Sequence, residues 1–146
     1  MKQLFLLLTV VTILITGCKK VDLTSSTKTI VKYELILPAP TIVDTTILAL
    51  FQEKPYIRYI DGSGMLTEEI YTKSFTTWSK EIDVTKRPFM GQLYARGYLN
   101  IREGKARINV YVDGKLNTSQ ELQLVTSGWD DYGMYNIYNI IPVYIP

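Results

Sequence analysis

Few side chains in this sequence could carry out chemistry, and most of them are carboxylates. Two acidic pairs, Glu68-Glu69 and Asp130-Asp131, are accompanied by one cysteine, Cys18, and by no histidine. Paired carboxylates can bind a cation or act as general acid and base. Glu68 and Glu69 have the pattern of a strand, in which adjacent side chains point to opposite faces, so we expect them not to converge. Without histidine, Cys-His zinc sites and imidazole-dependent triads are excluded, and we expect a protein that is not an enzyme and has no cofactor.

The segment around Asp130-Asp131 has the composition most typical of a binding site. Four aromatic residues lie within it, namely Trp129, Tyr132, Tyr135 and Tyr138. If their rings are exposed together they form a candidate binding surface for a glycan or a partner, and the two aspartates are a weak candidate for a Ca²⁺ site. The alternative is a last strand whose tyrosines cap the core, and exposure distinguishes the two.

The first eighteen residues have the pattern of a targeting segment. Lys2 is followed by a mainly apolar run over residues 4–15, which is too short to span a bilayer and fits a signal peptide. The sequence Ile15-Thr16-Gly17-Cys18 resembles a bacterial lipobox, which implies cleavage between Gly17 and Cys18 and lipidation of Cys18. A diacylglyceryl group and an added acyl chain, as the resemblance implies, anchor a protein stably to a membrane.

The remaining chain has the length of one domain. We divide it into a signal peptide (1–17), a lipid-anchored polar linker (18–28) and a single folded domain (29–146). The full sequence contains 47% hydrophobic residues, which is sufficient for a core, and its net charge of +2 with dispersed lysines and arginines does not indicate nucleic acid binding. The predicted location is the bacterial cell envelope, on the outer or the inner membrane, with the domain facing the periplasm.

Apolar residues repeat with a period of two in most of the domain. Residues 30–37, 56–61, 65–72, 77–84, 90–99 and 105–112 read as strands. Residues 41–51 contain enough β-branched residues for another strand, although 47–51 could also begin a helical turn. Short strands without intervening helices predict an antiparallel, immunoglobulin-like β-sandwich of about seven to nine strands.

Two glycine-containing turns predict hairpins. Residues 62–64 (Gly-Ser-Gly) separate two of the strands. At Asp113-Gly114 we expect a three-residue loop with a bulge, because this pairs Val110 with Leu116, whereas a two-residue loop would pair Val110 with a polar residue.

Two aromatic features of the strands are explained by packing. Trp78 is expected to be a core aromatic residue. Tyr94, Arg96 and Tyr98 alternate with small and apolar residues, so they share the more polar face of one strand, where cross-strand packing accounts for them.

Several blocks in order resemble the MmpS-type domain: Tyr33-Glu34 and residues 57–64, 78–84, 93–100 and 106–116. Proteins of that type are small membrane-tethered β-sandwiches, and the mycobacterial ones are accessory subunits of RND-class exporters. The resemblance implies a transport-accessory role and no catalytic residues. This sequence uses a lipid where those proteins use a transmembrane helix.

Two functional hypotheses follow. The first is a non-catalytic envelope lipoprotein whose domain contacts an envelope transporter or assembly protein. The second is a lipoprotein that binds a small molecule or glycan through the C-terminal aromatic segment.

Overall fold

The computed structural model describes residues 28–51, 54–126 and 132–146, with the backbone alone at 126 and 137–142. Within these ranges the chain forms nine strands and one short helix. The elements are β1 (Thr29–Ile36), α2 (Thr45–Leu50), β2 (Tyr56–Ile60), β3 (Leu66–Glu69), β4 (Thr77–Val84), β5 (Phe89–Leu99), β6 (Lys105–Val112), β7 (Lys115–Gln123), β8 (Val125–Thr126) and β9 (Gly133–Ile145).

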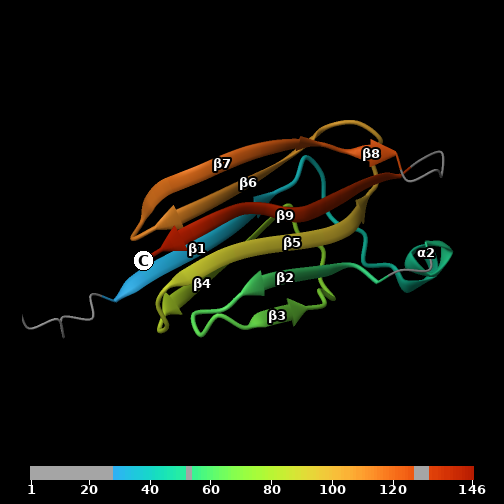
Figure 1. Ribbon diagram of the computed structural model, residues 1–146. Helices are drawn as coiled ribbons and strands as arrows, with labels where there is room; N and C mark the ends of the chain where they lie inside the picture. Colours follow the sequence, from blue (N-terminus) through green and yellow to red (C-terminus); the bar gives the residue numbers. More distant parts are fainter. Residues whose placement is uncertain (1–27, 52–53, 127–131) are drawn as a thin grey trace, which may run out of the picture.

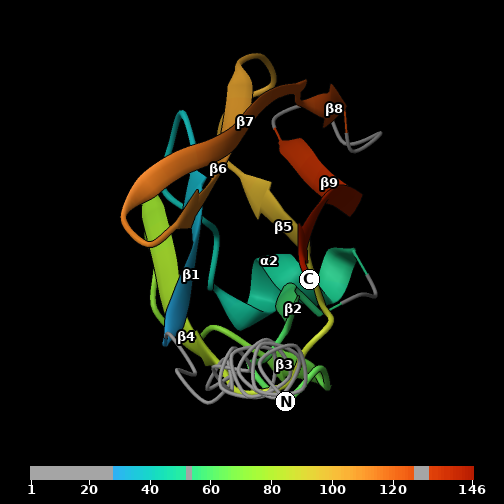
Figure 2. The same cartoon turned by 60° about the vertical axis from the view of Figure 1, so that its left-hand side comes forward.

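The strands form two antiparallel sheets. One has the order β4-β1-β6-β7 and the other the order β3-β2-β5-β9-β8. Figures 1 and 2 show them as two layers, with α2 beside one end of the five-stranded layer. The predicted all-β fold with two antiparallel sheets is confirmed.

The core between the sheets is built by strand alternation. In β1 the side chains of Val31, Tyr33 and Leu35 are fully buried, while the residues between them are half-buried on the other face. A Cβ added to Gly91 of β5 would lie 2.5 Å from the Tyr33 hydroxyl, so the absent side chain leaves room for the Tyr33 ring between the layers. Each such buried side chain contributes about 1.5–3 kcal/mol.

Trp78, expected in the core, packs against it without being fully enclosed. Its side chain is half-buried, and its ring centroid lies 6.0 Å from that of Tyr59. It therefore closes the side of the sandwich where β4 and β2 face each other.

The strand predicted at residues 41–51 is wrong, and the alternative of a helical turn is correct. Asp44 Oδ1 accepts hydrogen bonds from the amides of Thr46 (2.8 Å) and Ile47 (3.3 Å), which caps the first turn of α2. Only Thr41 makes a β-type contact, an isolated bridge to Leu99. An N-terminal cap thus overrides the β-branched composition of the segment.

The Asp113-Gly114 hairpin has a two-residue turn instead of the expected three-residue loop. Both turn residues have positive φ, 49° and 75°, and Val112 pairs with Lys115. A bulge further along β7 then pairs Val110 with Thr118 instead of Leu116. The expected pairing fails because Leu116 is 56% exposed on a mostly exposed strand, so burial does not select the register there.

The other predicted hairpin is confirmed. Asp61 Oδ1 accepts hydrogen bonds from the Ser63 amide (2.9 Å) and the Met65 amide (3.1 Å), and Gly64 has a φ of 85°. This turn connects β2 and β3 at the edge of the five-stranded sheet.

Candidate functional site

Several of the predicted site residues lie outside the described residues. These are Gly17 and Cys18 of the lipidation motif, and Trp129, Asp130 and Asp131 of the C-terminal segment. The backbone of Tyr138 belongs to β9, but its side chain is not among those described. Tyr132 is half-buried, and its ring meets Phe51 edge-on at a centroid distance of 5.6 Å.

Tyr135, expected as part of a binding surface, is a core residue. Its side chain is 2% exposed, and its hydroxyl lies 2.9 Å from that of Tyr71. Both hydroxyls occupy the space next to Gly97. A Cβ added to Gly97 would lie 2.0 Å from the Tyr71 hydroxyl and 2.4 Å from the Tyr135 hydroxyl. Burial raises the pKa of both tyrosines. Alternation along β9 turns Tyr135 inward, so its ring cannot stack on a ligand.

The adjacent carboxylates Glu68 and Glu69 diverge, as the strand pattern predicts. Glu68 forms an ion pair with Arg58, and Glu69 accepts hydrogen bonds from Lys80 Nζ (2.7 Å) and the Tyr59 hydroxyl (2.9 Å). Partial burial acts to raise the pKa of Glu69, but the bonds from Lys80 and Tyr59 outweigh it and hold the pKa below its usual range. Each carboxylate therefore serves a separate structural contact.

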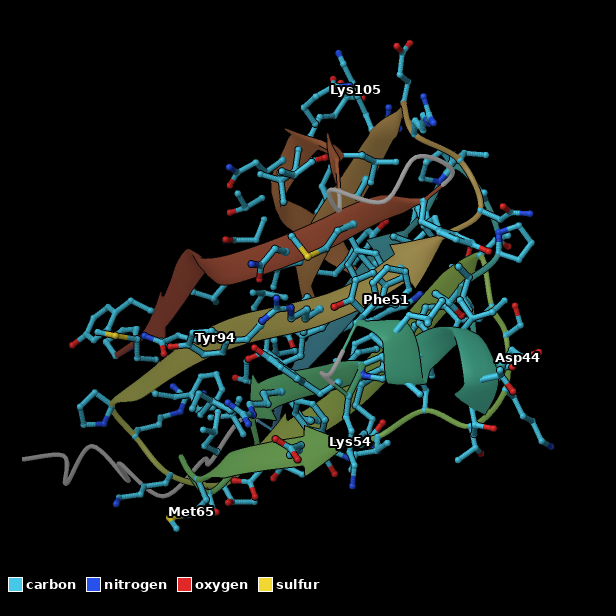
Figure 3. The ribbon with its side chains drawn as sticks, turned by 90° about the vertical axis from the view of Figure 1, so that its right-hand side faces the viewer. Asp44, Phe51, Lys54, Met65, Tyr94 and Lys105 are labelled. Atoms are coloured by element: carbon cyan, nitrogen blue, oxygen red, sulfur yellow. The ribbon has the colours of Figure 1, made fainter. Side chains whose placement is uncertain are left out.

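The outer face of the five-stranded sheet gathers tyrosine and arginine side chains from β2 and β5. Tyr56 is paired with Arg96, and Arg58 with Tyr94, so aromatic rings and guanidinium groups alternate across the two strands. Met134 of β9 adjoins them. We call these five residues the Tyr–Arg face, and Figure 3 looks onto it.

Contacts within the Tyr–Arg face hold its side chains in place. The Arg58 guanidinium lies 4.3 Å from the centroid of the Tyr56 ring, a cation–π contact, and also meets Glu68. Arg96 Nη2 donates to Met134 Sδ at 3.7 Å, and the Tyr94 hydroxyl donates to Gln92 Oε1 at 2.7 Å. These contacts orient the rings and the guanidinium groups on the sheet.

An aromatic stack extends this face towards α2. Phe51 stacks on Tyr98 with ring centroids 3.9 Å apart and an interplanar angle of 9°. Tyr98 is consequently only 3% exposed although it belongs to the outer row of β5. The stack attaches the end of α2 to the sheet and places the helix beside the Tyr–Arg face.

A groove runs between α2 and the end of β3. Its volume is about 550 Å³, and its apolar lining includes Val43, Leu48, Ala49, Pro55 and Ile70. At Lys54 and Ile70 it continues into a polar end of about 290 Å³. The polar end is lined by Lys54, Tyr56, Arg58, Glu68, Ile70 and Arg96.

The sequence pattern contained part of this site. Tyr94 and Arg96 stand out as an alternating pair, and Tyr56-x-Arg58 repeats the same spacing. Recognising that the two rows are neighbours requires the pairing of β2 with β5, which the sequence does not reveal. The groove was missed entirely, because residues 41–51 were expected to form a strand.

In comparisons with known proteins, no family model and no curated protein matches this chain. In the ranges that the structure describes, no helix is long and apolar enough to cross a membrane, and no group of three or more potential metal ligands is found.

Proposed function

We propose that this protein is a non-catalytic cell-envelope lipoprotein that recognises a protein partner through the Tyr–Arg face. Residues 1–17 are the cleaved signal peptide, Cys18 bears the lipid, and residues 18–28 are the spacer. The observation that carries the proposal is the alternation of tyrosine and arginine across β2 and β5. Tyrosine, arginine and methionine are enriched at protein interfaces, and tyrosine and arginine are among the residues that contribute most of the binding energy.

The outer face of the other sheet has a different character. There Glu34 accepts hydrogen bonds from Asn109 Nδ2 (2.8 Å) and the Tyr111 hydroxyl (3.0 Å) and pairs with Lys32 (3.4 Å). This cluster lacks the alternating tyrosine and arginine side chains of the Tyr–Arg face. This contrast supports the five-stranded sheet as the recognition side.

An immunoglobulin-like arrangement is part of the proposal. In the four-stranded sheet, β1 lies beside β4 as strand B lies beside strand E in that fold. In the other sheet, β2, β5 and β9 lie side by side in the order of strands C, F and G. Strands β6 and β7 take the place next to β1 that strand A occupies there. The order is also compatible with the resemblance to the MmpS-type domain, from which we propose an envelope transporter or assembly subunit as the partner.

A second candidate function is binding of a small molecule, and the groove beside α2 favours it. Its volume of about 550 Å³ lies within the range of about 300–1,000 Å³ that is usual for ligand sites. This candidate no longer depends on the C-terminal aromatic residues, since Tyr135 is buried.

Site-specific photo-cross-linking in intact cells tests the leading proposal. Photoreactive benzoylphenylalanine in place of Tyr94 should capture a transporter or assembly subunit, whereas the same group in place of exposed Ser79 on the other sheet should not. Arg58→Ala should reduce the capture about tenfold, as expected when an interface arginine is lost.

The matched control is Arg107→Ala. Arg107 pairs with Glu121 and its side chain is 52% exposed, close to the 42% of Arg58 in its pair with Glu68. Equal capture at positions 79 and 94, or equal loss in the two arginine variants, would overturn the proposal.

A further inference from the structure

The groove beside α2 adjoins a second, polar depression, with which it shares the lining residues Lys54 and Ile70. Val43, Leu48 and Ala49 line it from the α2 side, and Pro55 and Ile70 line it from the side of the sheet. Ile70 is 53% exposed, so an apolar surface remains open to solvent there. An occupant that covers this surface needs an apolar part, because burying it removes apolar area from water.

The other end of the groove is lined by basic side chains. Among the described residues, Lys54, Arg58 and Arg96 line it together with one carboxylate, that of Glu68. Glu68 pairs with Arg58. In the described part of the chain Lys54 takes part in no ion pair, and its side chain is exposed. An anionic group can therefore meet Lys54 without displacing a protein carboxylate.

From this juxtaposition we propose that the groove binds a free single-chain amphiphile with an anionic head, namely a long-chain carboxylate. The chain lies along Leu48, Ala49 and Pro55, and the carboxylate meets Lys54, with the Arg96 guanidinium beside it. The volume of about 550 Å³ suits one such molecule. This inference deepens the second candidate function by naming its ligand class, and it does not require the protein partner.

The arrangement also determines the selectivity. A cationic head on the same chain would meet the like charge of the Lys54 ammonium group, so it should bind more weakly. A short carboxylate has the head but leaves the apolar lining uncovered. Chain and head group are both needed.

Photoaffinity labelling of the full lipidated protein in phosphatidylcholine vesicles tests the proposal. The probe is a dodecanoate with a diazirine in its chain, and the labelled residues are located by mass spectrometry. Labelling should concentrate on the lining residues within 43–49, 54–55 and 70–72. Unlabelled dodecanoate should compete with the probe, whereas dodecyltrimethylammonium and butyrate should compete at least about tenfold less well.

Two pairs of variants locate the chain and the head. Ala49→Trp fills the groove from an exposed helix position and should reduce labelling about tenfold, whereas Thr46→Trp, also exposed on α2 but outside the lining, should not. Lys54→Glu should reduce labelling about fivefold, and Lys115→Glu, with the same change of net charge at the distant β6–β7 turn, should leave it unchanged. Circular dichroism verifies that each variant is folded.

Three outcomes would overturn the proposal: equal competition by the cationic amphiphile, unchanged labelling in Ala49→Trp, or competition by phosphatidylglycerol vesicles as strong as that by dodecanoate. The last result would identify membrane lipid as the source of the head group. This failure is distinguishable from that of the protein-recognition proposal, because unchanged probe labelling in Ala49→Trp together with intact capture at position 94 rejects only the groove ligand.

Discussion

At the scale of single residues, Glu34 is the clearest case of a side chain whose ionisation stabilises the fold. Its side chain is 16% exposed in the four-stranded sheet. The bond from Asn109, followed by those from Tyr111 and Lys32, holds its pKa below the usual value of 4.5, although partial burial opposes this. A pKa depressed by folding means that the stabilisation is present above the usual pKa and is lost as the pH falls through the folded value.

Glu34→Gln should therefore lower the free energy of unfolding at pH 7 by about 1–2 kcal/mol. The difference from the wild type should shrink as the pH falls below about 4.5, because the wild-type carboxyl then also becomes neutral. Urea unfolding at several pH values measures both effects.

The control is Glu81→Gln on the exposed face of the neighbouring strand β4, which should change the stability by less than about 0.5 kcal/mol. A difference between Glu34→Gln and the wild type that stays constant down to pH 3 would show that the carboxylate is not responsible.

At the scale of elements, the β6–β7 hairpin depends on a contact with a third strand. Asp113 Oδ1 accepts a hydrogen bond from the Ile30 amide at 2.8 Å, and the Asp113 amide donates to the Ile30 carbonyl at 2.9 Å. Asp113 also has a φ of 49°, a left-handed conformation that aspartate and asparagine tolerate better than most residues. Asp113 is thus one of the two turn residues, and it also attaches the turn to the start of β1.

Asp113→Ala should lower the free energy of unfolding by about 2 kcal/mol, since it removes the acceptor and places alanine in the left-handed region. Asp113→Asn keeps a side-chain oxygen and the conformational preference, so it should cost less than about 1 kcal/mol. Thermal or urea unfolding compares the two variants, and equal losses would mean that the side-chain bond to Ile30 does not stabilise the turn.

At the scale of the whole molecule, the sandwich presents two unlike outer faces. The four-stranded sheet carries polar groups that satisfy one another, such as Glu34 with Asn109, whereas the five-stranded sheet carries the Tyr–Arg face and the adjoining groove. In the proposed function, the domain is tethered to the membrane and meets its partner or ligand through the five-stranded sheet, while the four-stranded sheet stays hydrated.

The proposed anchor makes a prediction at the same scale. Cys18→Ser should abolish the incorporation of palmitate, because the proposed acyl chains are attached at Cys18. Metabolic labelling with palmitate measures this. Palmitate labelling that persists in the variant would contradict lipidation at Cys18.

The sequence alone determined the features that depend on local pattern. Period-two alternation predicted strands at residues 30–37, 77–84 and 105–112, and the structure forms β1, β4 and β6 there. The Gly-Ser-Gly turn and the divergence of Glu68 from Glu69 follow from the same local rules. In each case the structure is determined by residues within a few positions of one another, so the sequence is sufficient to predict it.

Only the tertiary structure decided what depends on contacts between distant segments. The pairing of Tyr56 with Arg96 joins residues of two strands that are not consecutive, and it creates the Tyr–Arg face. The stack of Phe51 on Tyr98 holds α2 against the sheet and opens the groove at its side. The burial of Tyr135 depends on the space that Gly97 leaves in the neighbouring strand. These contacts are selected by packing between the elements, which no local period encodes.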